Sequence, residues 1–228
     1  LLLVDTISGL AGADYQHDAW GVDVAISGSQ KGLMLPPGLS FNALSPKAIE
    51  ASKTSTLPKA FWGWNEIIAM NKTGYWPSTP ATNLLYGLSE ACDMLLGEGL
   101  PAVFKRHRRW SAAAQAAVRA WGLPIQCADD ALCSPILTGV IMPEGVDADA
   151  VRKVIYERFD CSLGTGLGKI KGRMFRIGHL GDCNDLTLLA AIAGCEIGLR
   201  VSDVSLQASG VQAAMEYIQS NPIPALKA

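Results

Sequence analysis

The sequence has few of the residues that build metal centres or nucleic-acid surfaces. Its three histidines are scattered, and none of its six cysteines stands in C-x-x-C spacing, so a zinc site is not expected. The formal net charge is −2 and no long basic run occurs, which argues against a nucleic-acid partner. No apolar run reaches the length of a membrane span. We expect no metal, nucleic-acid or membrane partner.

The densest basic cluster is the segment 105–109. It falls in a stretch with helical character, and we expect it to be a solvated helix face rather than a binding patch. Isolated cysteines without a secretory signal are typical of a reducing compartment, so we expect a cytoplasmic protein. The tail Leu226–Ala228 differs from a peroxisomal Ser-Lys-Leu signal.

Hydrophobic residues make up 49% of the 228 residues and charged residues 18%, which allows a large core. The first four residues, Leu1–Val4, are all apolar and predict a buried strand of a parallel sheet. Because such a strand needs neighbours, we expect the chain to be the later part of something longer. Expressed alone, it should be poorly soluble.

The most informative stretch is Ser27–Gly38, which reads SGSQKGLMLPPG and follows the apolar run Val22–Ile26. Small residues there let the backbone turn sharply and approach a ligand. Lys31 stands among small and apolar residues, where poor solvation favours the neutral amine that forms Schiff bases. On composition alone, an ordinary surface lysine is an equal alternative.

The pattern Ser-Gly-Ser-Gln-Lys-Gly-x-x-x-Pro-Pro-Gly resembles the cofactor-lysine segment of class V aminotransferases, which are pyridoxal 5′-phosphate (PLP) enzymes of fold type I. The resemblance covers nearly all of the chain and is greatest to the serine–glyoxylate and alanine–glyoxylate aminotransferases. It implies that Lys31 carries the cofactor as a Schiff base. It also implies an α/β fold, with the later part of a large mixed-sheet domain followed by a small α+β domain.

Further cofactor contacts are expected on both sides of the lysine. Asp5 ends the first apolar run, and ligands collect at the carboxyl ends of parallel strands. A turn or helix-cap role is equally common for such an aspartate. The stretch Val-Asp-Thr-Ile-Ser resembles the family's Val-Asp-Ser motif, which implies that Asp5 pairs with the pyridinium and that Ile7 packs on the ring. Ser29 and Gln30 would donate hydrogen bonds to the phosphate.

The segment Asn71–Pro80 contains two prolines that favour an extended loop. It resembles the family's Tyr-x-Pro-x-Thr-Pro loop, which reaches the cofactor phosphate of a neighbouring subunit. The resemblance implies a homodimer or higher homo-oligomer in which Tyr75 and Thr79 serve the neighbour. Members often have tyrosine where Ser78 stands, which weakens the assignment, and an ordinary ordered loop is the alternative.

Arg176 lies between apolar residues in the strand-like segment Met174–Gly178. An unpaired buried charge is costly, and a guanidinium binds a carboxylate with two hydrogen bonds. The segment resembles the family's Arg-Ile-Gly motif, whose arginine binds the substrate α-carboxylate. A structural salt bridge is the alternative, and His179 nearby is expected to be structural.

We divide the chain into 1–80, the later part of a large PLP-binding domain, 81–124, two interdomain helices, and 125–228, a small C-terminal domain. The connection to the segment 39–44 is too short for a crossover, so that strand should run antiparallel. The resemblance implies amino transfer from serine, or alanine, to glyoxylate. Two alternatives are a cysteine desulfurase or lyase of the same fold, and an inactive fragment that only dimerises.

Overall fold

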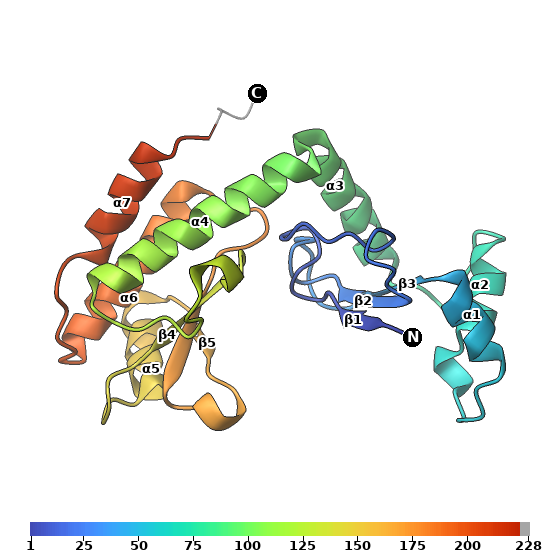
Figure 1. Cartoon of the computed structure of the whole chain (residues 1–228), viewed down its shortest axis with the longest axis horizontal. Helices are drawn as coiled ribbons and strands as arrows, with labels where there is room; N and C mark the ends of the chain where they lie inside the picture. The colour runs from blue at the N-terminus through green and yellow to red at the C-terminus, as the bar shows by residue number, and fades with distance from the viewer. Residues whose placement is uncertain (224–228) are drawn as a thin grey trace. The chain divides into compact units, whose positions relative to one another are not determined.

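A computed structural model describes residues 1–223 and divides into two compact units, Leu1–Leu100 and Pro101–Ala228 (Figure 1). The tail 226–228 lies outside the described residues. No helix in the described part of the chain is long and apolar enough to cross a membrane.

The first unit contains β1 (Leu3–Asp5), β2 (Val24–Gly28), β3 (Ser40–Leu44), α1 (Pro46–Lys53), α2 (Trp64–Asn71), α3 (Thr82–Glu98) and a 3-10 turn at Ala60–Trp62.

The sheet of the first unit has the order β1-β2-β3. β1 runs parallel to β2, with Asp5 opposite Ile26, and β3 runs antiparallel to β2, with Ser40 opposite Gly28. The antiparallel direction of the third strand is therefore confirmed. The parallel pairing places the carboxyl ends of β1 and β2 at the same edge of the sheet, where the predicted cofactor residues follow.

Within the described residues, the apolar run at the start of the chain is not buried. β1 is an edge strand of this sheet, and the side chains of Leu1 and Leu3 are 60% and 59% exposed. The burial expected for this run requires neighbours on both sides, and β1 pairs with one neighbour among residues 1–223.

A buried carboxylate joins the start of β1 to the start of α1. Asp23 is 5% exposed and accepts hydrogen bonds from the Leu2 amide (2.8 Å), the Ser45 hydroxyl (2.9 Å) and the Lys47 ammonium (3.3 Å). The bond from Leu2 and then the one from Ser45 lower the pKa of Asp23. Ser45 also accepts from the Ala48 amide as the N-cap of α1.

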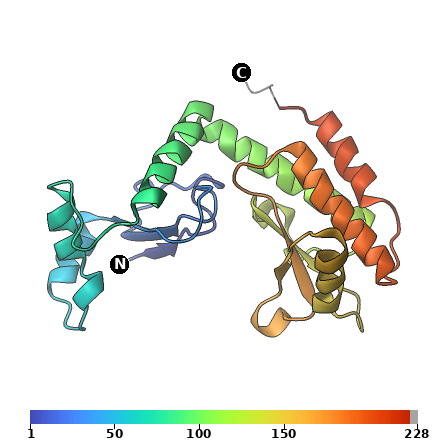
Figure 2. The ribbon, with the colours of Figure 1, turned by 180° about the vertical axis from the view of Figure 1, so that it is seen from behind.

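The second unit packs helices against a small antiparallel sheet. Its elements are α4 (Leu100–Ala120), β4 (Leu137–Ile141), α5 (Ala148–Phe159), β5 (Gly164–Thr165), β6 (Met174–Gly178), α6 (Asp185–Val201), α7 (Gly210–Ser220), and 3-10 turns at Asp130–Leu132 and Gly168–Ile170. The strand order is β4-β6-β5. Helix α6 packs on both α5 and α7, as the view from behind also shows (Figure 2). The core includes Trp110, Ala113, Val118, Trp121, Val140, Ile155, Phe175, Ile177, Leu188 and Ile192.

The basic cluster at 105–109 is only partly a solvated face, which corrects the prediction. Arg109 and His107 are buried, whereas Lys105 and Arg108 are exposed. Arg109 binds the Asp185 carboxylate with two hydrogen bonds of 2.5 and 3.0 Å, and Trp110 donates to the same carboxylate. The partner lies 76 residues away in the sequence, so the local charge pattern could not reveal it.

A single carboxylate also connects three helices of the second unit. Glu196 of α6 accepts hydrogen bonds from the Trp121 indole (3.0 Å), the Ser209 hydroxyl (3.2 Å) and the Val211 amide (3.0 Å), and Arg200 binds its other oxygen. Burial alone would raise the pKa of Glu196, but these donors together lower it to about 2.

We therefore predict that Glu196→Gln lowers the free energy of unfolding by about 1–3 kcal/mol at neutral pH, the range for hydrogen bonds to a charged group. Because the folded-state pKa of Glu196 is depressed, this stabilisation is complete above the ordinary glutamate pKa of 4.5 and is lost as the pH falls toward about 2. Urea unfolding of parent and variant at a series of acidic pH values measures the difference. Glu216→Gln, at an exposed position of α7, is the control, and a difference that does not shrink with acidification would contradict the assignment.

Candidate active site

The lysine segment is a tight loop that follows β2. Lys31 is half-buried, and its carbonyl accepts a hydrogen bond from the Met34 amide (2.9 Å), which closes a turn. Met34 has a φ of +64°, in the left-handed region that non-glycine residues rarely adopt. The loop that presents the lysine is therefore held in one defined conformation.

Ser29 fixes both ends of this loop. It is fully buried, donates its hydroxyl to the Pro36 carbonyl (2.7 Å) and accepts from the Leu39 amide (3.1 Å). A hydroxyl has one hydrogen to donate, and here Pro36 takes it. This geometry does not favour the predicted contact of Ser29 with a phosphate, and it gives the residue a positioning role for Lys31 instead.

Gly32 brings the lysine loop against the loop that follows β1. A Cβ atom at this position would overlap the Leu10 carbonyl oxygen and would lie 3.2 Å from the Ala11 side chain. Only glycine allows the two backbones to approach this closely. The residue after Lys31 thus touches the segment that begins at Asp5.

The end of β1 carries the predicted carboxylate. Asp5 is exposed, and one of its oxygens, Oδ1, accepts a hydrogen bond from the Ile7 amide (2.8 Å). The next residue, Thr6, is buried and binds the Ile26 carbonyl through its amide (2.8 Å) and its hydroxyl (3.0 Å). Thr6 therefore locks the ends of the two parallel strands together, and it holds Asp5 at the edge.

Two more predicted residues, Ile7 and Gln30, lie close to Gly28, the last residue of β2. A Cβ atom at Gly28 would lie 2.9 Å from the Gln30 amide oxygen and 3.7 Å from a methyl group of Ile7. The structure therefore brings Ile7 and Gln30 to the same place, on either side of a residue that has no side chain. A larger residue at position 28 would fill the space that they border.

The Tyr75–Thr79 loop is in the same unit and is open to solvent. Tyr75 is 67% exposed and Thr79 is exposed as well. The backbone is held at its start, because the Asn71 side chain donates to the Tyr75 carbonyl (3.0 Å). Both hydroxyl-bearing side chains are accessible for an external contact.

Arg176 lies in the central strand of the second unit's sheet, directly between two glycines. Its cross-strand partners are Gly139 of β4 and Gly164 of β5. A Cβ atom at Gly164 would lie 3.0 Å from the Arg176 Nε atom, so the missing side chain leaves room for the guanidinium.

The Nε atom of Arg176 is buried and has no hydrogen-bond partner among the described residues. No carboxylate of residues 1–223 forms an ion pair with it either, so the described part of the chain does not supply the alternative structural salt bridge. Arg176 as a whole is half-buried, so its buried Nε atom is left with a donor that an anionic ligand could use.

His179 is built into the fold. It is 1% exposed, contacts the Thr138 hydroxyl (2.9 Å) and the Pro135 carbonyl (3.2 Å) through its two ring nitrogens, and its pKa is lowered by burial to about 4. The ring is therefore neutral at physiological pH. These contacts fit the structural role expected from the sequence.

Comparison with known proteins gives a consistent result. No family model matches the chain. The chain is 45% identical over 221 residues to serine–glyoxylate aminotransferase of Arabidopsis thaliana, covering 96% of this chain and 55% of that protein. It is 40% identical over 228 residues to L-aspartate–glyoxylate aminotransferase of Paracoccus denitrificans, covering 100% of this chain and 58% of that protein.

The crystal structure of pyridoxamine–pyruvate aminotransferase from Mesorhizobium loti superposes with a TM-score of 0.88 at 30% identity, over 96% of this chain and 57% of that one.

The chain is similar to these aminotransferases over nearly all of its own length. It spans about half the length of the curated relatives that it matches. The α/β fold of type I that the sequence predicted is confirmed, because the solved aminotransferase structures share it with the chain.

Several positioning residues escaped the sequence analysis. Thr6 and Gly32 hold the two loops of the site together, and Gly139 and Gly164 flank Arg176. The glycine after Lys31 was visible as part of the motif, but its contact with Leu10 depends on strand pairing. The two glycines around Arg176 lie 37 and 12 residues away from it in sequence, and only the register shows that they flank it.

We predict that Gly32→Ala destabilises the first unit by about 1–3 kcal/mol, the usual cost of forcing extra atoms into a packed site. The added methyl group would push the lysine loop away from Leu10 and Ala11. Gly9→Ala is the matched control, because a Cβ atom there meets nothing within 4 Å. Chemical unfolding of both variants tests this, and equal stability of the two would show that the contact is unimportant.

Proposed function

We propose that this chain forms the lysine-bearing part of a PLP-dependent aminotransferase that moves an amino group from serine, or alanine, to glyoxylate. The products would be hydroxypyruvate, or pyruvate, and glycine. The observation that carries the proposal is that Asp5 ends β1 and Lys31 follows the end of β2, its parallel neighbour. The 45% identity to a serine–glyoxylate aminotransferase supports this choice of substrates.

The residues present fit PLP. A carboxylate, an amine and an amide side chain follow one sheet edge, Gly28 leaves space between Ile7 and Gln30, and the second unit carries a buried Nε atom without a partner. When bound, the cofactor supplies an electron sink for the bonding electrons released at the substrate Cα.

Lys31 would hold the cofactor through its amine and, once the substrate has released that amine, would act as the general base that takes the proton from the substrate Cα. A tightly closed loop suits this role, because a base must stay within hydrogen-bond reach of the proton. The turn at Met34 and the Ser29 contacts provide that restraint.

Asp5 would hold the proton on the pyridine nitrogen. Its Oδ1 atom accepts from the Ile7 amide, which orients the carboxylate and leaves the second oxygen for the ring. An ion pair of this kind is worth about 4 kcal/mol at 4 Å for an effective dielectric constant near 20. Ile7 itself would pack against the ring.

Arg176 would bind the α-carboxylate of the amino-acid substrate through its guanidinium. Gly164, across the strand pair from it, leaves space for the Arg176 side chain. Two parallel hydrogen bonds to one carboxylate fix its orientation as well as its position.

We further propose that the protein works as a homodimer or larger homo-oligomer. The exposed hydroxyls of Tyr75 and Thr79 would bind the phosphate of the neighbouring subunit's cofactor. We retain the division into 1–80, 81–124 and 125–228 as a proposal for the assembled protein.

For Lys31→Ala in the full-length gene product, we predict loss of the visible absorbance band of bound PLP. Turnover should fall about 10²- to 10⁴-fold, the usual contribution of a positioned acid–base group. Borohydride reduction followed by peptide mapping should label Lys31 in the parent protein. Lys53→Ala, on the exposed surface of α1, is the control. Retained absorbance with a borohydride label on another lysine would contradict the assignment of Lys31 as the residue that holds the cofactor.

For Arg176→Lys, we predict a rise in KM for the amino acid of about 10- to 100-fold, equivalent to about 1.5–3 kcal/mol for lost hydrogen bonds to a charged group. Cofactor absorbance and thermal stability should stay near those of the parent. Arg173→Lys, exposed just before β6, is the matched control. A loss of stability without a change in KM would instead indicate a structural arginine.

A further inference from the structure

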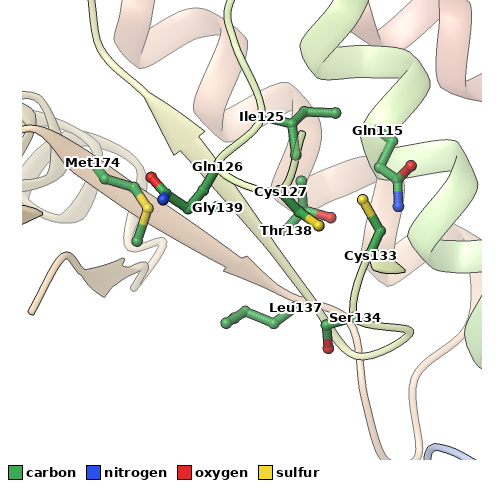
Figure 3. Close-up of a pocket in the computed structure, with 10 residues that line it drawn as sticks. All are labelled: Gln115, Ile125, Gln126, Cys127, Cys133, Ser134, Leu137, Thr138, Gly139 and Met174. Atoms are coloured by element: carbon green, nitrogen blue, oxygen red, sulfur yellow. The ribbon is translucent and has the colours of Figure 1, made fainter. Parts of the chain in front are cut away.

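The second unit contains a small pocket that the proposed function does not use. Its volume is about 160 Å³, and it lies between α4 and the start of the sheet (Figure 3). Residues from α4, β4, β6 and the segment before β4 line it, and two of them are cysteines, Cys127 and Cys133. Figure 3 shows that both sulfur atoms lie in the part of the pocket near Gln115.

The segment that carries the two cysteines is anchored at both ends. The Gln126 amide donates to the Gly139 carbonyl on β4 (2.9 Å), and the Ser111 hydroxyl of α4 donates to the Ser134 carbonyl (2.9 Å). Each anchor residue is the direct neighbour of one cysteine. The backbone therefore holds the two thiols at fixed places on either side of the intervening turn.

The turn between the cysteines is also fixed from within. The Asp129 carboxylate accepts from the Ala131 amide (2.9 Å) and caps the 3-10 turn, and Asp130 forms an ion pair with Arg119 of α4. The Cys127 thiol donates to the Asp129 carbonyl (3.3 Å). These contacts bend the chain so that its two ends face each other across the pocket.

The two sulfur atoms lie in the same part of the pocket (Figure 3). Burial raises the pKa of the Cys133 thiol, and the nearby Cys127 thiol adds to this shift. Both cysteines are only partly buried, so a small reagent can reach them. Two accessible thiols in the same part of one pocket are candidates for a disulfide.

We propose that Cys127 and Cys133 form a redox-active dithiol that closes to an intramolecular disulfide on reaction with a small-molecule disulfide of the glutathione type. This modification site is independent of the proposed aminotransferase activity. It requires neither PLP nor the residues of the first unit.

The reaction balances as two successive exchanges. The Cys127 thiolate attacks one sulfur of the small disulfide, which forms a mixed disulfide and releases one small thiolate. Cys133 then gives up its proton and attacks the Cys127 sulfur, which forms the protein disulfide and releases the second small thiolate. The two protein thiols lose two electrons and two protons, and the oxidant gains them as two thiols. We assign the first attack to Cys127, because burial raises the pKa of the Cys133 thiol and so disfavours its thiolate.

A second cysteine pair in the same unit supplies an internal control. This pair is Cys161 and Cys195, and Cys195 is fully buried in α6. Burial raises the pKa of the Cys195 thiol, and Cys161 adds to this shift. A small oxidant cannot reach Cys195 in the folded protein. Its reaction with an alkylating reagent therefore reports unfolding.

The test treats the full-length gene product with glutathione disulfide, blocks the remaining thiols with an alkylating reagent and digests the protein. A protease that cleaves before aspartate separates the cysteines, because Asp129 and Asp130 lie between them. Mass spectrometry should then find two peptides joined by a Cys127–Cys133 disulfide, with Cys195 protected from the reagent. Failure to detect this linkage, or its detection only where Cys195 is alkylated, would overturn the proposal.

Two variants test the order of the steps. Cys133→Ser should accumulate a mixed disulfide of glutathione on Cys127, because the second thiol is missing. Cys127→Ser should leave Cys133 largely unmodified at the same exposure time. Cys92→Ser, in the other unit, should form the same linkage as the parent. Equal modification of Cys133 with and without Cys127 would refute the proposed sequence of attack.

Discussion

The parallel pairing of β1 with β2 is the constraint on which the candidate site depends. It puts the residues that follow each strand at one edge of the sheet, so Asp5 and the Lys31 loop become neighbours although 26 positions separate them. Thr6 secures the pairing where the strands end, and Gly32 lets the two following loops touch. A side chain at position 32 would force these loops apart without changing any group that performs chemistry.

The second unit carries a positively charged side chain, that of Arg176, in the central strand of its sheet. An arginine between two ordinary strand residues would be covered by their side chains, and its charge would need a permanent partner. Here the neighbours across the strands are glycines, and the Nε atom is left without a protein acceptor among the described residues. This unpartnered Nε atom is the observation on which the proposed carboxylate-binding role of Arg176 rests.

Local sequence patterns predicted those features that depend on a few adjacent residues. The short connection before β3 required an antiparallel strand, and the motif around Lys31 indicated a turn. Local patterns could not reveal contacts between residues that lie far apart in the sequence. The contact of Gly32 with Leu10 is one example, because it depends on the pairing of β1 with β2.

The same limit applies to single side chains. A basic cluster gave no sign that Arg109 is buried against Asp185. The motif suggested a phosphate contact for Ser29, whereas the fold uses its hydroxyl to hold Pro36 and Leu39. In both cases the partner of a polar group decides its role, and the partner is set by the tertiary structure.

The Asp23 carboxylate couples the local unfolding of two segments of the first unit, the start of β1 and the start of α1. Its donors come from the start of β1, from the N-cap of α1 and from Lys47, so one buried charge depends on segments that are more than 20 residues apart. If either segment detached, the carboxylate would stay buried with fewer donors, which raises the cost of a partial opening. The first strand and the first helical turn should therefore separate from the sheet together, as one cooperative unit rather than as two fraying ends.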